Sequence, residues 1–198
     1  MKNMKTLQVG TRGSKLALWQ AEQVAKKLLE AKPDLKVNIK VIKTVGDKIL
    51  DVALSRIGEK GLFTKEIEKQ LIDKSIDVAV HSMKDMPSEL VPELFIGAVL
   101  KRENPQDVLI SHKNYSFKDL PAHAVIGTSS LRRIALIKRL RPDIATVDIR
   151  GNIETRVAKM KKENLDGIIL AFAGVKRLGL EDLITDILPG ELFIPAVA

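Results

Sequence analysis

The sequence contains no cysteine among its 198 residues. The absence of thiols excludes disulfides, thiolate metal sites and cysteine nucleophiles from this chain. Aromatic residues make up only 4% of the sequence, which disfavours the stacking surfaces that bind single-stranded nucleic acid. The three histidines, His81, His112 and His123, are scattered along the chain, so we expect no metal site.

The sequence also lacks long apolar runs. No stretch approaches the length of a membrane span, and the N-terminus has no apolar region of secretory type. We therefore expect a cytoplasmic protein without membrane contact. The 33 basic and 25 acidic residues give a net charge of +8. This balance indicates an anionic partner, either an acidic small molecule or nucleic acid; the alternative is ordinary solubilising charge.

Strand and helix patterns alternate along the chain, which predicts an α/β fold. We expect strands over residues 7–10, 37–42, 78–80, 95–100, 108–110, 124–127, 145–149 and 167–171. We expect helices over residues 15–31, 62–74, 131–140, 153–162, 175–178 and 181–188. Residues 44–61 are polar and mixed in pattern, so we expect this segment to be irregular and partly mobile.

Two halves of the sequence resemble each other in a fixed order. Three short segments recur, each at an equivalent junction: Val9–Thr11 with Ile126–Thr128, Lys32–Leu35 with Arg141–Ile144, and Asp77–Val80 with Asp166–Ile169. We expect two similar α/β domains, residues 1–101 and 102–192, with a ligand cleft between them. Residues 193–198 then form a shortened return crossover toward the first domain.

Arginines accompany three strand-to-helix junctions. Gly127–Arg133 combines serines, a helix start and two arginines, and Thr11–Ser14 repeats that layout. Arg150–Asn152, with Arg156, repeats it a third time. A helix N-terminus disfavours cations unless an anion is bound there, and guanidinium binds carboxylates and phosphates bidentately. The pattern therefore predicts an anion site; the alternative is solvated arginines on basic helices.

Asp85 is an acid among these basic groups, at the end of the predicted strand over residues 78–80. A carboxylate there suits proton transfer or the stabilisation of a cationic intermediate. The alternative is that Asp85 only pairs with Lys84 or an arginine. Lys60, between two glycines, and Arg177, near Gly174 and Gly179, are further candidates that are equally well explained as solvated side chains.

Several motifs together resemble the porphobilinogen deaminase family, also called hydroxymethylbilane synthases. The resemblance covers residues 7–197 and rests on Thr11–Gln20, Gly58–Phe63, Val80–Asp85, Gly127–Arg133, Arg150–Asn152 and Leu170–Gly179. It implies a reaction in which four porphobilinogen units, each with an acetate and a propionate, are joined with loss of ammonia into hydroxymethylbilane for haem synthesis. It also implies two domains similar to type II periplasmic binding proteins.

The resemblance assigns roles to individual residues. Asp85 matches the family's catalytic acid/base. The positions that match cofactor-binding, substrate-binding or cleft-lining residues are Arg12, Ser14, Lys60, Ser82, Lys84, Thr128, Ser129, Ser130, Arg132, Arg133, Arg150, Asn152, Arg156 and Arg177. The expected partners are porphobilinogen and oligopyrrole intermediates, and the expected state is a monomer.

One departure concerns the dipyrromethane cofactor, which the family carries as a thioether on a cysteine of a third, C-terminal domain. This chain has no cysteine. We therefore expect it to correspond to the family's first two domains, and a separate C-terminal domain is a candidate partner. Two other functions remain open: a two-domain module that binds carboxylated pyrroles without turnover, and a nucleic-acid-binding protein, against which the scarcity of aromatics argues.

Overall fold

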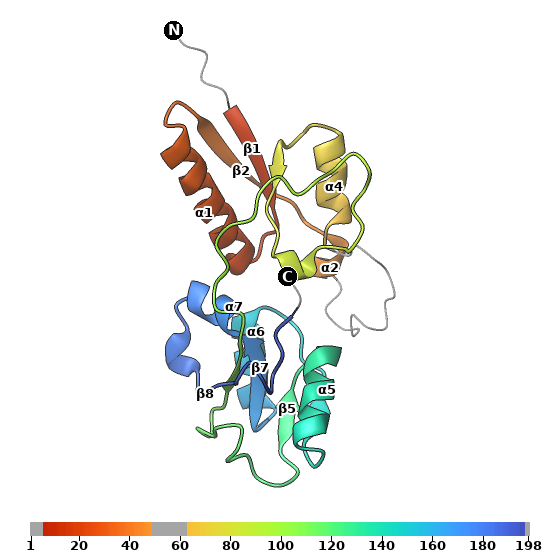
Figure 1. The fold of residues 1–198 in the computed structure, drawn as a ribbon, viewed down its shortest axis with the longest axis vertical. Helices are drawn as coiled ribbons and strands as arrows, with labels where there is room; N and C mark the ends of the chain where they lie inside the picture. Colours follow the sequence, from red (N-terminus) through yellow and green to blue (C-terminus); the bar gives the residue numbers. More distant parts are fainter. Residues whose placement is uncertain (1–5, 49–62, 197–198) are drawn as a thin grey trace. The chain divides into compact units, whose positions relative to one another are not determined.

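The computed structural model describes residues 6–48 and 63–196, which fall into two compact α/β units. Unit 1 comprises residues 6–48 and 63–100, and unit 2 comprises residues 101–196. Each unit has a sheet with helices packed against it (Figure 1). Within the described residues, no helix has the length and apolarity needed to cross a membrane. The expected α/β fold class is confirmed.

Unit 1 contains a three-stranded parallel sheet in the order β2-β1-β3. Its strands are β1 (Thr6–Thr11), β2 (Lys36–Val41) and β3 (Val78–Ala79), and its helices are α1 (Lys15–Ala31), α2 (Val45–Lys48), α4 (Lys65–Ile72) and the 3₁₀ turn η1 (Met83–Asp85). Ile42, Ile67 and Ile76 form its buried core cluster. Helix α1 packs on β1 and β2, so the β1–α1 junction lies at the carboxyl end of the central strand.

Unit 2 contains a five-stranded sheet in the order β6-β5-β7-β4-β8. Its strands are β4 (Asp107–Ile110), β5 (Val125–Gly127), β6 (Ala145–Val147), β7 (Gly167–Ala171) and β8 (Asp186–Ile187). Strands β5, β6 and β7 are parallel, whereas β4 is antiparallel to β7 and β8. The helices are α5 (Leu131–Leu140), α6 (Ile153–Lys162), α7 (Phe172–Arg177) and the 3₁₀ turn η2 (Glu181–Leu183).

The sheet of unit 2 is buried on both faces. Leu109 and Ile169 belong to one core cluster, and Val108, Ile168 and Leu170 belong to another. Successive residues of a strand point to opposite faces, so a continuous apolar run fills two cores at once. Burial of this kind holds the strand ends, and the polar junctions that follow them, in fixed positions.

The predicted duplication is confirmed by matching hydrogen bonds. The backbone N–H of Asp77 donates to the carbonyl of Gln8 at 2.8 Å, and that of Asp166 donates to the carbonyl of Val125 at 3.0 Å. Asp77 directly precedes β3, which pairs in parallel with β1, and Asp166 directly precedes β7, which pairs in parallel with β5. The same junction is therefore built twice from different residues.

Helix ends also follow the predicted pattern. The side chains of Ser14, Ser130 and Asn152 accept hydrogen bonds from the first turns of α1, α5 and α6. Such N-cap bonds satisfy backbone donors that have no partner within the helix. The predicted starts of these three helices are confirmed, and each cap is a residue that the sequence also marks as a site candidate.

The predicted strand over residues 95–100 is wrong. Residues 95–100 have no regular secondary structure, and Phe95 and Val99 are 85% and 68% exposed. A strand needs a neighbour for its backbone hydrogen bonds, and β8 of unit 2 finds one in β4. In unit 2, β4 pairs with the far side of β7, but among the described residues of unit 1 no strand pairs with the far side of β3. The apolar sequence alone therefore does not produce a strand.

Four other predictions need correction. The run over residues 78–80 is half-buried rather than buried, and only Val78 and Ala79 form a strand, because β3 lies at the edge of its sheet. Residues 181–188 form η2 and then β8 instead of a helix, because Thr185–Leu188 hydrogen-bonds to β4. Strand β6 ends at Val147, two residues before the predicted end. In the segment over residues 44–61, Val45–Lys48 forms α2 and is not irregular, and residues 49–61 lie outside the described residues.

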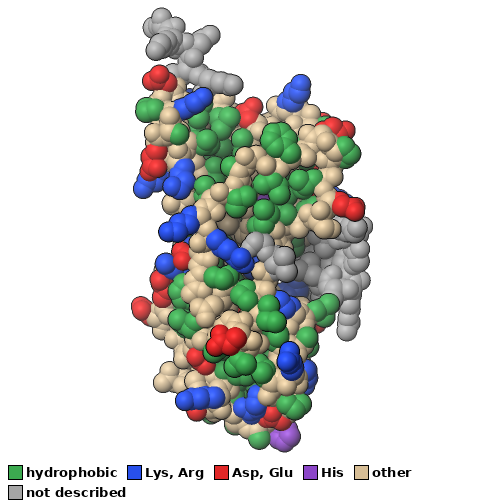
Figure 2. Space-filling model, in the orientation of Figure 1, with side chains coloured by type: hydrophobic (Ala, Val, Ile, Leu, Met, Phe, Trp, Pro, Cys, Tyr) green, Lys and Arg blue, Asp and Glu red, His purple; other side chains and the backbone are tan. Residues whose placement is uncertain are grey.

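Basic and acidic side chains are interspersed on the face of the molecule that Figure 2 shows. A nucleic-acid-binding surface gathers its positive charge into a patch or stripe. The net charge of +8 is not gathered in that way on this face.

Candidate functional site

Three arginines of unit 2 lie within electrostatic reach of one another. Burial lowers the pKa of Arg156, and the positive charges of Arg133 and Arg150 lower it further. The guanidinium of Arg156 is held by a hydrogen bond from Nε to the carbonyl of Gly151 at 2.8 Å. Mutual repulsion of this kind is relieved when an anion binds among the three charges.

A buried donor without a partner lies in the same cluster. Arg133 is 7% exposed, and its Nε–H has no hydrogen-bond partner among the described residues. A buried polar group without a partner costs about 1–3 kcal/mol, so such a donor usually has a role beyond folding. An incoming carboxylate or phosphate oxygen would supply the missing acceptor. The sequence marked all three arginines, and the structure brings them together.

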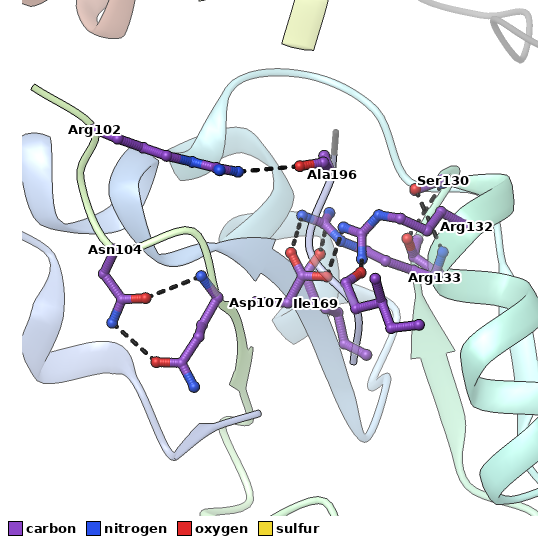
Figure 3. Close-up of polar contacts among 11 residues, drawn as sticks. Arg102, Asn104, Asp107, Ser130, Arg132, Arg133, Ile169 and Ala196 are labelled. Atoms are coloured by element: carbon purple, nitrogen blue, oxygen red, sulfur yellow. Dashed lines mark hydrogen bonds and ion pairs between the residues drawn. The ribbon is translucent and has the colours of Figure 1, made fainter. Parts of the chain in front are cut away.

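Arg132 and Arg133 share one internal carboxylate, that of Asp107 on β4 (Figure 3). The Nη2 atom of Arg132 lies 2.7 Å from Oδ2 of Asp107, and Nη2 of Arg133 lies 2.8 Å from Oδ1. The placement of two cations in the first turn of α5 therefore does not require an external anion. Arg133 also donates to the carbonyl of Ile169 at 2.9 Å.

The hydroxyl groups at the β5–α5 junction bind backbone atoms. Thr128 accepts a hydrogen bond from the N–H of Ser130, and Ser129 donates to the carbonyl of Ile149 and accepts from its N–H. Ser130 caps α5. These contacts hold the junction in shape, and a ligand-binding role for the three hydroxyls stays a prediction.

The β6–α6 junction turns at Gly151. Its φ of +113° is a conformation that favours glycine, and an added Cβ would lie 2.7 Å from Cγ2 of Thr155. Asn152 follows and caps α6 through a 2.8 Å hydrogen bond from the N–H of Thr155. The tight turn thus sets the start of α6 and the position of Arg156 one turn later.

In unit 1, Arg12 lies over the ring of Phe63, 4.1 Å from the ring centroid. This cation–π contact orients the guanidinium beside the β1–α1 junction. Ser14 caps α1, and Thr11 donates to the carbonyl of Ala17. The structure therefore gives the first arginine junction a defined geometry, built partly by a residue that is distant in sequence.

The segment after β3 carries Ser82, Lys84 and Asp85. The hydroxyl of Ser82 hydrogen-bonds to the side-chain amide of Gln20 on α1, with O···N and O···O distances of 3.0 and 3.2 Å. Lys84 and Asp85 are exposed on η1. Asp85 lines a shallow hollow together with Glu68 and Thr64, so its carboxylate is open to a ligand.

His81 connects these groups electrostatically. Burial lowers the pKa of His81, the charges of Asp85 and Glu68 raise it, and Arg12 lowers it; the net effect is a pKa below the ordinary value of 6.5. The imidazole is therefore largely neutral at pH 7. Asp85 and Arg12 thus both lie within electrostatic reach of His81 in unit 1.

Two sequence candidates fall elsewhere. Lys60 lies outside the described residues. Arg177 lies in the last turn of α7, next to Lys176, which pairs with Glu103 at 3.3 Å. Its role as a ligand-binding residue stays a prediction.

Sequence reasoning missed Asp107, Phe63 and Gln20 as contributors to the site. Asp107 carried a signal, because an acidic residue opens the otherwise apolar run Val108–Ile110 and is 1% exposed. A fully buried aspartate almost always has a cationic partner. Phe63 and Gln20 end two of the motifs that carry the family resemblance, but their contacts with Arg12 and Ser82 are made by tertiary packing and could not be read from those motifs.

Comparison with known proteins identifies relatives of the whole chain. A family model described as "Porphobilinogen deaminase, dipyromethane cofactor binding domain" matches residues 7–198. The porphobilinogen deaminase of Syntrophomonas wolfei is 69% identical over 194 residues, covering 98% of this chain and 63% of that protein. The porphobilinogen deaminase of Carboxydothermus hydrogenoformans is 56% identical, with 98% and 62% covered. The chain therefore spans a little over three fifths of the length of these relatives.

A solved structure supports the fold. A lipoprotein of Bacillus subtilis named for methionine binding superposes with a TM-score of 0.51, covering 93% of this chain and 78% of that one. Because the two sequences are only 15% identical, the likeness concerns the two-domain α/β architecture alone.

Proposed function

The chain belongs to the porphobilinogen deaminase family, and from that premise we propose that it carries the catalytic part of a hydroxymethylbilane synthase. The proposed reaction joins porphobilinogen units head to tail with loss of ammonia. Relatives at 69% and 56% identity, both named porphobilinogen deaminase, support this assignment. These relatives are longer than this chain, so the enzymatic activity of a full-length relative is a proposal for this chain.

The observation that carries the proposal is the arginine cluster of unit 2. Porphobilinogen bears an acetate and a propionate, and a growing oligopyrrole accumulates carboxylates. Arg156 is buried and is repelled by the positive charges of Arg133 and Arg150, and Arg133 has a buried Nε–H without a partner among the described residues. A bound carboxylate supplies negative charge that offsets the repulsion at Arg156, and guanidinium groups bind carboxylates bidentately.

Asp85 is proposed as the acid/base of the reaction. Loss of ammonia leaves a cationic pyrrole intermediate, which a nearby carboxylate stabilises, and proton transfer to or from the pyrrole requires an accessible group. Asp85 is exposed beside a hollow of unit 1, and the neighbouring His81 has a lowered pKa, so that Asp85 is not neutralised by an imidazolium. Lys84, Ser82 and Arg12 are the proposed substrate-binding groups of the same unit.

The family's dipyrromethane cofactor fits the described residues in part. The cofactor's carboxylates match the donors of Arg133, Arg150 and Arg156, including the orphan Nε–H. No residue of this chain can form the thioether, because the sequence has no cysteine. When bound, the cofactor supplies the primer to which pyrrole units are added, and the residues of this chain hold its carboxylates.

The alternative left open by the sequence, a module that binds carboxylated pyrroles without turnover, is not favoured by relatives that are named porphobilinogen deaminase. The two functions differ in ammonia release, which only the first produces. We further propose that the protein is a cytoplasmic monomer whose partners are porphobilinogen, its oligomers and a separate C-terminal domain. The sequence-based expectations given above support these assignments.

Calorimetric titration of the purified chain with porphobilinogen tests the proposal. Arg156→Gln removes one charge of the cluster, and we expect it to weaken binding at least tenfold, or about 1.4 kcal/mol. Lys161→Gln is the matched control, because Lys161 is an exposed cation on the same helix; we expect its affinity to stay within twofold of the original. Absence of binding by the unmodified chain, or equal losses in both variants, would refute the proposal.

A further inference from the structure

Asp107 belongs to neither the acid/base group nor the proposed ligand-binding residues, yet it contacts two of the latter. It opens β4, is 1% exposed, and accepts hydrogen bonds from Arg132 and Arg133, one on each carboxylate oxygen (Figure 3). A buried carboxylate that binds two guanidinium groups through separate oxygens fixes the orientation of both.

The two arginines depend on Asp107 to different degrees. The side chain of Arg133 is 9% exposed and has a second anchor inside the unit, the carbonyl of Ile169. The side chain of Arg132 is 28% exposed, and its other anchor is the carbonyl of Ile194, 2.6 Å from Nη1. Ile194 is itself 58% exposed, so Asp107 is the only buried anchor that the described residues provide for Arg132.

Arg132 keeps donors for a ligand in this arrangement. A guanidinium has five N–H groups, and among the described residues two of them have partners, Asp107 and Ile194. The remaining three, Nε–H among them, have no partner among the described residues and can donate to a carboxylate. Asp107 and Ile194 hold the end of the side chain while these donors stay available.

We propose that Asp107 is a positioning residue for carboxylate recognition, acting through Arg132. An arginine side chain loses much rotational freedom when a ligand fixes it, and this loss opposes binding. Asp107 removes that freedom before the ligand arrives, so the affinity gained comes from preorganisation and not from contact with the ligand. The proposal rests on the proposed function for the identity of the ligand, and on geometry alone for the positioning.

The first test is a thermodynamic cycle with porphobilinogen as ligand, measured by calorimetry on the 198-residue chain. We expect Asp107→Asn to weaken binding about tenfold and Arg132→Ala to weaken it at least as much. The double variant should bind within twofold of Arg132→Ala, because the proposed effect on affinity passes through Arg132, whereas Arg133 keeps its second anchor on the carbonyl of Ile169. Losses that multiply in the double variant would overturn the proposal, since a general structural role predicts independent effects.

Asp166→Asn is the matched control. Asp166 also lies in unit 2 and also binds a cation, Lys113 at 2.8 Å, but it contacts neither arginine. We expect it to destabilise the unit while leaving porphobilinogen affinity within twofold. A tenfold loss of affinity in this control would mean that a half-buried ion pair away from the arginines also affects binding, and would overturn the specific role of Asp107.

The second test needs no ligand and no variant. NMR of ¹⁵N-labelled arginine in the unmodified chain reports rotation of each guanidinium, and we expect slow rotation for Arg132 and fast rotation for the exposed Arg139. Fast rotation of Arg132 would overturn the positioning role, even if Asp107→Asn does not fold.

Succinate, a simple dicarboxylate, separates failure of this proposal from failure of the proposed function. Succinate binding that weakens in Asp107→Asn, together with no binding of porphobilinogen, refutes the function and retains the positioning role. Porphobilinogen binding that is unchanged in a folded Asp107→Asn variant retains the function and overturns the positioning role. Binding of neither ligand overturns both.

Discussion

The side-chain carboxylate of Asp166 accepts a hydrogen bond from the backbone N–H of Val125 at 2.7 Å. Asp77 makes the same contact with the N–H of Gln8, also at 2.7 Å, in the other unit. Each aspartate joins the start of one strand to the start of its parallel neighbour. The duplicated sequence thus preserves a specific interaction and not only an apolar pattern.

Asp166→Asn should lower the free energy of unfolding by about 1–3 kcal/mol at pH 7, the range for hydrogen bonds to charged groups. Burial raises the pKa of Asp166, but hydrogen bonds from Lys113 and Val125 outweigh burial and hold it below the ordinary value of 3.8. The stabilisation is therefore complete above pH 3.8 and is lost as the pH falls through the lowered value. Denaturant unfolding of both proteins between pH 7 and pH 2 measures this; a stability difference that grows toward low pH contradicts the assignment.

The titration of His81 should report the charge of Asp85. The pKa of His81 lies below 6.5 because of burial, and Asp85 partly opposes that effect. Asp85→Asn removes the opposing charge and should lower the pKa of His81 further. Because the folded pKa is depressed, protonation of His81 costs stability as the pH falls below 6.5. An NMR titration of the imidazole Cε1–H measures the pKa of His81 in the unmodified protein and in the variant. An unchanged pKa in the variant would show that the charge of Asp85 does not act on His81.

Gly127 should tolerate no side chain. An added Cβ would lie 2.9 Å from Cγ2 of Ile168 and 3.1 Å from Cδ1 of Leu165, both in the packed core. We expect Gly127→Ala to lower stability by about 1–3 kcal/mol through overpacking. Gly190→Ala is the control, because nothing lies within 4 Å of its added Cβ. Thermal unfolding compares the two, and equal melting temperatures would show that the core around Gly127 relaxes freely.

Local sequence patterns predicted those helices whose start, apolar face and end are all marked within a short stretch of sequence. The helices that begin after Ser14, Ser130 and Asn152 combine a cap, an apolar face and a stop, and all three form where expected. Residues 95–100 show the opposite case. Their apolar sequence is suited to a strand, but a strand also needs a partner, and pairing is decided by distant residues.

The same distinction applies to the site. Arg133 was predicted from one strand-to-helix junction and Arg150 and Arg156 from the next, and the repeated topology places Arg133 and Arg150 within electrostatic reach of Arg156. The internal partner of Arg132 and Arg133 was not predicted, because Asp107 lies about 25 residues earlier on an antiparallel strand. Sequence spacing marks which side chains can bind an anion, whereas packing decides which of them are already paired within the chain.

Ammonia release tests the central claim most directly. The chain would be joined to the part of the Syntrophomonas wolfei relative that lies outside the match, and porphobilinogen consumption and ammonia would be followed together. We predict one ammonia for each porphobilinogen consumed, loss of both in Asp85→Asn, and retention of both in the exposed control Glu93→Gln. Turnover that persists in Asp85→Asn, or a folded fusion that binds porphobilinogen and releases no ammonia, would contradict the proposed catalytic function.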